Sequence, residues 1–63
     1  MRLDPSVAWY HNELCVALTR LRRFDEAEPE CREAVRLDPR NSKFQDNLTE
    51  FLEQAEQERM KNK

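Results

Sequence analysis

The side chains best suited to bind a metal or act as nucleophiles are one histidine and two cysteines. His11 and Cys15 lie four residues apart, which places them one turn apart on the same face of a helix. Cys31 is the second thiol of the chain. A structural zinc site needs about four ligands, and these residues fit no paired Cys/His zinc pattern. The spacing therefore predicts a histidine on a helix face, no metal site and no bound cofactor.

The two cysteines are expected to be buried and reduced. Each lies within an apolar stripe of a predicted helix, where a small apolar side chain suits the position. Reduced thiols are typical of intracellular proteins, so the chain is predicted to be cytoplasmic. A bridge between Cys15 and Cys31 is the lesser alternative, and it requires that their two helices face each other.

Carboxylates are the other candidates for chemistry. The glutamates of the first two predicted helices include carboxylates near one another, and they are Glu13, Glu26, Glu28, Glu30 and Glu33. Acid–base catalysis would need a pocket that shifts their pKa values. The sequence contains no Ser-His-Asp order, glycine-rich phosphate loop or nucleotide fingerprint. The chain is therefore predicted not to be an enzyme.

Charges of both signs are mixed along the chain. There are 11 basic and 13 acidic residues, for a formal net charge of −2, so no concentrated basic face is available for nucleic acid or an anionic membrane. Arg20, Arg22 and Arg23 form a short basic turn that is interpreted as a solvated loop. No apolar run approaches the roughly 20 residues of a membrane span. Neither nucleic acid nor a membrane is predicted as a partner.

The composition predicts an all-α fold. Glycine is absent, strong helix formers dominate, and no segment alternates apolar and polar residues as a strand would. We expect helices over about 6–21, about 24–37 and from 42 onward, arranged as an antiparallel hairpin followed by a third packed helix. Only 38% of the residues are hydrophobic, so the core is thin and a bound neighbour or self-association is expected.

Local patterns predict how these helices begin and which side they bury. The first helix carries an apolar stripe of Tyr10, Leu14, Ala17, Leu18 and Leu21, widened by Ala8 and Cys15. Pro29 would disturb the second helix, so we expect a start at Asp25 capped by the Asp25–Glu28 pair, or a local bend. Ser42 and Gln45 match the S-x-x-Q capping box of the third helix.

The chain contains an internal repeat. Arg2-Leu3-Asp4-Pro5 recurs as Arg36-Leu37-Asp38-Pro39, a period of about 34 residues. With the same offset, Tyr10 corresponds to Phe44, Leu14 to Leu48, Leu18 to Leu52 and Leu21 to Ala55. If both copies stack in the same way, Tyr10 and Phe44, and likewise Leu14 and Leu48, should have the same surroundings.

The period and the residue types over 2–39 resemble the tetratricopeptide repeat. The resemblance is carried by Leu14, Cys15, Leu18, Leu21, Phe24-Asp25-Glu26-Ala27, Cys31, Ala34 and Leu37-Asp38-Pro39. The chain departs from the family pattern at His11 in the favoured Trp place, at Cys15 and Cys31, and at the Arg22-Arg23 turn. The resemblance implies one repeat over 1–40, with the tail of a preceding unit at 2–5, and a C-terminal capping helix over 41–63. We therefore expect a piece of a longer array.

The resemblance also implies a function. Such repeats are scaffolds that bind a protein or peptide in a concave groove, so a cytoplasmic co-chaperone role is one expectation. The groove residues would be Trp9, Asn12, Val16, Thr19, Arg20, Lys43, Asp46 and Glu50. Trp9 is either a groove contact or a shield for the end of the repeat. The basic clamp with which part of the family holds chaperone carboxylates is not present at the matching positions.

Self-association is the alternative function. An incomplete repeat leaves apolar helix faces open, and these could close in a symmetric homodimer. The third helix, with Phe44, Leu48 and Phe51 on one side and a polar opposite side, is either a cap for the array or part of such a dimer.

Overall fold

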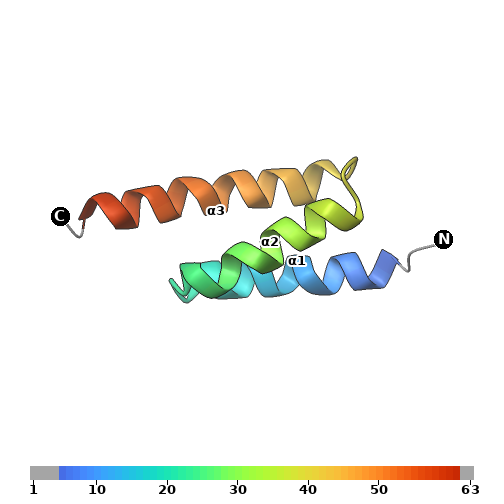
Figure 1. Ribbon diagram of the computed structural model, residues 1–63, viewed down its shortest axis with the longest axis horizontal. Coiled ribbons are helices and arrows are strands. Elements are labelled where there is room, and N and C mark those ends of the chain that lie inside the picture. The colour runs from blue at the N-terminus through green and yellow to red at the C-terminus, as the bar shows by residue number, and fades with distance from the viewer. Residues whose placement is uncertain (1–4, 62–63) are drawn as a thin grey trace.

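The computed structural model describes residues 5–61, which form three α-helices joined by two short turns. The helices are α1 (Pro5–Arg20), α2 (Phe24–Leu37) and α3 (Ser42–Lys61). Figure 1 shows α1 and α2 as an antiparallel hairpin, with α3 returning in the direction of α1 and extending beyond the α1–α2 turn. No strand is present in this range. The predicted all-α hairpin with a third packed helix is confirmed.

The predicted helix ranges agree with the structure to within about one residue, but two predicted caps are wrong. α2 begins at Phe24, as its predicted range has it, so the later start at Asp25 is wrong. Its N-cap residue Arg23 makes no side-chain capping bond. The Phe24 ring lies 6.2 Å from the Phe51 ring, so packing holds the first turn in place of the predicted cap. Glu28 instead accepts a 3.0 Å hydrogen bond from Arg32. Residues 2–4 of the repeated tetrapeptide lie outside the described residues.

The second wrong cap is that of α3, although the helix begins at Ser42 as predicted. Asn41, not Ser42, caps the helix, because its side-chain oxygen accepts the N–H groups of Lys43 at 3.0 Å and Phe44 at 3.2 Å. Gln45 donates to the carbonyl oxygen of Pro39 instead of closing a capping box with Ser42. Asparagine is among the strongest N-cap residues, so it takes the position that the S-x-x-Q pattern assigned to its neighbour.

The α1–α2 turn is built without glycine. Arg22 has φ 63°, in the left-handed region that costs a non-glycine residue about 1 kcal/mol. The N–H of Arg22 bonds the Thr19 carbonyl at 3.0 Å, and the N–H of Arg23 bonds the Leu18 carbonyl at 2.9 Å. These bonds satisfy the last carbonyls of α1 as a Schellman motif does. An ion pair between Arg22 and Glu58 also ties the turn to α3.

The buried residues of the two hairpin helices are small. Among the described residues, the buried set is Ala8, Asn12, Cys15, Thr19, Ala27, Cys31 and Ala34 in the hairpin, with Phe44 and Phe51 in α3. The prediction of the α1 stripe is therefore wrong in part: Ala8 and Cys15 are buried, but Tyr10 and Leu21 are 61% and 65% exposed. The side of α1 that meets α2 carries small and polar residues, because the close approach of two helices leaves no space for larger ones.

Cys15 and Cys31 form a disulfide bridge between α1 and α2, so the prediction of reduced thiols is wrong. Their Cα atoms are 4.8 Å apart, because Ala27 and Ala34 beside them let the two helices approach closely. Stable disulfides are typical of oxidising compartments. The bridge therefore gives no support to the predicted cytoplasmic location. None of the helices in residues 5–61 has the length and apolar character to cross a bilayer.

The two copies of the repeat do not have the same surroundings at the two predicted pairs. Leu14 and Leu48 are both partly buried, but Leu48 packs against the core around Cys15 and Phe51, and Leu14 belongs to neither core cluster of the described residues. Phe44 is 1% exposed, whereas Tyr10 is 61% exposed, so the expectation of equal surroundings is wrong for that pair too. Phe44 is covered by α1 and α2, where Ala8 and Ala34 pack against it. No element of the described chain covers Tyr10 in the same way.

Candidate functional site

An open groove of about 710 Å³ runs between α1 and α3. It is lined by Trp9, Asn12, Glu13, Val16, Ala17, Arg20 and Leu21 from α1 and by Lys43 and Asn47 from α3. The lining is thus partly apolar, with two cations, one carboxylate and two amides. α1 supplies one wall and the first half of α3 supplies the other, so the turn that places α3 sets the width of the groove.

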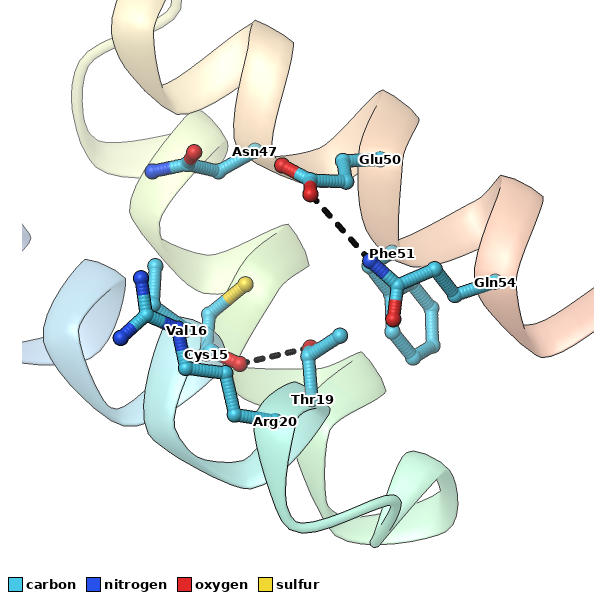
Figure 2. Close-up of a pocket in the computed structure, with 8 residues that line it drawn as sticks. All are labelled: Cys15, Val16, Thr19, Arg20, Asn47, Glu50, Phe51 and Gln54. Atoms are coloured by element: carbon cyan, nitrogen blue, oxygen red, sulfur yellow. Dashed lines mark hydrogen bonds between the residues drawn. The ribbon is translucent and has the colours of Figure 1, made fainter.

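A smaller cavity of about 110 Å³ adjoins this groove and shares Val16, Arg20 and Asn47 with it. Figure 2 shows the residues that line it: Cys15, Val16, Thr19, Arg20, Asn47, Glu50, Phe51 and Gln54. Arg20 lies on the α1 side of the cavity, and Glu50 and Gln54 lie on the α3 side. The cavity extends the groove toward the disulfide and the Phe51 ring.

Polar bonds fix the walls of the site. Asn47 donates through Nδ2 to Oδ1 of Asn12 at 2.7 Å and so links α3 to α1. Thr19 donates through Oγ1 to the Cys15 carbonyl at 2.7 Å, within α1 (Figure 2). Asn12 and Thr19 are buried, which explains why each has a hydrogen-bond partner. The Asn12 and Asn47 amides keep further donor and acceptor capacity, since one bond uses only part of it.

Trp9 combines the two roles that the sequence left open. Its ring meets the Phe44 ring edge to face, with ring centroids 4.8 Å apart and planes inclined by 75°. Such aromatic pairs contribute about 1 kcal/mol beyond the burial of their surface. The Trp9 side of the groove is nevertheless open, because the residue is 41% exposed. Trp9 therefore anchors α3 on α1 and also lines the groove.

The structure gathers most of the predicted groove residues at one place. Trp9, Asn12, Val16, Arg20 and Lys43 line the groove, Thr19 and Glu50 line the cavity, and Asp46 is exposed and lines neither. Asn47 was missed, although it lies four residues after Lys43 and three before Glu50 and hence on the same face of α3. That spacing could have predicted Asn47 as a groove residue.

The site offers surfaces for contact but no nucleophile paired with a base. Both thiols are consumed in the bridge. His11 lies against α2, where its Nδ1 is 2.6 Å from Oε1 of Glu30, so the predicted helix-face histidine has a partner on the other helix of the hairpin. Within residues 5–61, no three His, Cys, Asp or Glu side chains lie together as metal ligands would.

Comparison with known proteins gives one similarity. The chain is 46% identical over 46 residues to an inactive TPR repeat-containing thioredoxin of Arabidopsis thaliana, a match that covers 73% of this chain. It spans only 7% of the length of that relative. No family model matches the chain, and no solved structure matches it. The similarity to a TPR repeat-containing protein supports the tetratricopeptide resemblance.

Proposed function

We propose that this chain is a protein–protein interaction module of the tetratricopeptide type, which holds an extended peptide or a helix of another protein between α1 and α3. The observation that carries the proposal is the groove itself, in which two helices bring an aromatic residue, aliphatic residues, cations and amides to one surface. The similarity to a TPR repeat-containing protein adds support.

The lining suits a polypeptide for physical reasons. Trp9 and Val16 offer apolar surface, and tryptophan is enriched among the residues that dominate binding energy at interfaces. Asn12 and Asn47 can meet the N–H and C=O groups of a peptide backbone. Arg20 and Lys43 stand on opposite walls and favour a segment that carries a carboxylate.

The test is selection of ligands from a phage-displayed library of random peptides, followed by titration of the selected peptides. Trp9 is the single tryptophan, so its fluorescence reports on the groove directly. Selected peptides should change that fluorescence, and Lys43→Glu and Val16→Ser should each weaken binding by about fivefold or more. Glu53→Lys, exposed and outside the groove, is the control and should bind normally. Selected peptides that bind all variants equally would refute the proposal.

Self-association through open helix faces is the second candidate function. It is favoured by large apolar side chains that the described chain leaves exposed, including Val7 at 44%, Tyr10 at 61% and Leu21 at 65%. Isolated apolar side chains on a surface are ordinary, but several on one face are typical of an interaction surface. Light scattering over a range of concentrations tests it, because a constant monomer mass contradicts it.

A further inference from the structure

The side of α1 that points away from the rest of the hairpin carries a continuous apolar stripe. Its members are Val7, Tyr10, Leu14, Ala17 and Leu21, which follow one another at alternating intervals of three and four residues. Leu21 belongs to the stripe because its N–H still bonds the Ala17 carbonyl at 3.1 Å. This is the a/d spacing with which one helix packs lengthwise on another. Except for Leu14, all members are exposed.

Two opposite charges flank one edge of this stripe. Glu13 precedes Leu14 and Arg20 precedes Leu21, so both occupy the equivalent position beside the seam, one heptad apart. Both side chains are exposed. Neither takes part in a hydrogen bond or ion pair within residues 5–61, in contrast to Arg22, Arg23, Arg32 and Arg36. These two charges are therefore available to a partner.

We propose that the stripe docks on the same stripe of a second copy, with the two α1 helices antiparallel about a two-fold axis near residues 15 and 16. This inference rests on the self-association proposed above and specifies its surface. In this register, Leu14 faces Ala17 of the second copy and Tyr10 faces Leu21 of the second copy. Glu13 then faces Arg20 of the second copy, and two-fold symmetry repeats each contact.

The charges select this register over its neighbours. A shift by one heptad in one direction places Glu13 opposite Glu13 of the second copy, and a shift in the other direction places Arg20 opposite Arg20. Parallel pairing brings no Glu13 near an Arg20. In a parallel pair, a residue on the edge that carries Glu13 and Arg20 faces the opposite edge of the second copy, which carries neither. The antiparallel register is the one that buries most of the stripe and also pairs its free charges, which argues for a second copy as the occupant.

The proposed seam is short. α1 has 16 residues and is thus about 24 Å long, so the interface belongs to the small, transient class. Association is therefore expected to depend on concentration. The α3 wall of the groove, with Lys43 and Asn47, takes no part in the seam, whereas Glu13, Ala17, Arg20 and Leu21 belong to both surfaces. Variants of Lys43 therefore change binding in the groove alone, and a dimer would compete with a ligand for the α1 wall.

The experiment is sedimentation equilibrium of the oxidised chain and of three charge variants. Glu13→Arg and Arg20→Glu each create two like-charge contacts across the axis, so each should raise the dimer dissociation constant by about tenfold. The combined Glu13→Arg/Arg20→Glu variant exchanges the two charges and should return to within about threefold of the original chain. High salt should shrink the differences between the variants, because the contacts are exposed.

A matched apolar pair of variants locates the surface. Leu21→Glu should abolish the dimer, whereas Leu52→Glu, on an exposed face of α3 near a second depression of about 470 Å³, should leave it intact. If Leu52→Glu abolishes the dimer and Leu21→Glu does not, the proposed seam is wrong, but self-association through another surface is supported. A failure of the double charge exchange to restore the dimer would also overturn the seam. A monomer mass at every concentration would overturn both.

Discussion

α1 makes two contacts of opposite character. Toward α2 it presents small residues, and Cys15 is covalently joined to Cys31, with the two Cα atoms 4.8 Å apart. Toward α3 it presents Trp9, which meets Phe44, and Asn12, which bonds Asn47, with a groove and a cavity left between these points. Small residues close one interface completely, whereas larger residues at separate points hold the other partly open. The hairpin is therefore the fixed part, and the position of α3 determines the site.

The largest expected effect comes from the point that holds α3 on α1. Phe44→Ala removes a ring that is 1% exposed and packs against Trp9, and should lower the free energy of unfolding by about 4 kcal/mol. Urea denaturation followed by circular dichroism measures the loss. Leu52→Ala, exposed on the same helix, should change it by about 0.5 kcal/mol or less. Similar losses in the two variants would mean that Phe44 does not hold α3.

The next effect concerns the opposite interface. Cys15→Ala/Cys31→Ala opens a bridge with a sequence separation of 16 and should lower the free energy of unfolding by about 3 kcal/mol, because the unfolded chain loses a constraint. Reductant should shift the urea midpoint of the original chain and leave that of the double variant unchanged. A midpoint of the original chain that does not respond to reductant would contradict the bridge.

A smaller effect is expected where a polar bond crosses the open interface. Asn47→Ala leaves the buried Asn12 oxygen without its partner, so the free energy of unfolding should fall by about 2 kcal/mol. A double-mutant cycle with Asn12→Ala should show that the two losses are not additive. Asp46→Ala, one residue earlier and exposed, serves as the control. Additive losses would show that the Asn12–Asn47 bond does not couple the helices.

A change at the start of α3 separates helix formation from packing. Asn41→Ala removes the side chain that accepts two N–H groups and should lower the free energy of unfolding by about 1 kcal/mol. Ser42→Ala should change it by less than about 0.5 kcal/mol, since Ser42 is exposed and is not the cap. Both losses are measured in the same urea series. A larger loss for Ser42→Ala than for Asn41→Ala would show that Ser42 is the cap, as the S-x-x-Q pattern predicted.

The smallest effect lies outside both interfaces. Arg36 donates to the Glu33 carboxylate and thereby holds the pKa of Glu33 below its usual value. The pair therefore stabilises the fold at pH above the unfolded-state pKa of Glu33, and this contribution is lost as the pH falls through the lower folded-state pKa. Glu33→Gln should reduce the urea midpoint slightly at pH 7 and not at pH 3. Glu53→Gln, an exposed control, should show no such difference.

The sequence predicted the helices well because helix formation is largely local. The range 24–37 of α2 could be predicted because the segment is rich in strong helix formers, contains no glycine and is followed by Pro39. The burial of α1 was predicted less well, because Tyr10 and Leu21 are as apolar as a core position requires. Only the three-dimensional arrangement shows that α2 approaches the side with Ala8 and Cys15.

The site could be predicted in outline through the family resemblance. Seven of the eight predicted groove residues line the groove or its cavity, since equivalent positions on parallel helices face the same way. The Asn12–Asn47 bond and the Trp9–Phe44 contact could not be predicted, because they depend on the distance and tilt of α3 relative to α1. The bridge could not be predicted for the same reason, because it depends on how α1 and α2 face each other.

The disulfide also makes the segment from Cys15 to Cys31 a closed covalent ring that contains the whole α1–α2 turn. Arg22 and Arg23 lie exposed on that ring, where trypsin would cleave. A single cut there leaves one molecule of unchanged mass apart from the added water, and the halves separate on a denaturing gel only after reduction. New chain ends could thus be introduced at the turn without detaching α1 from the other helices.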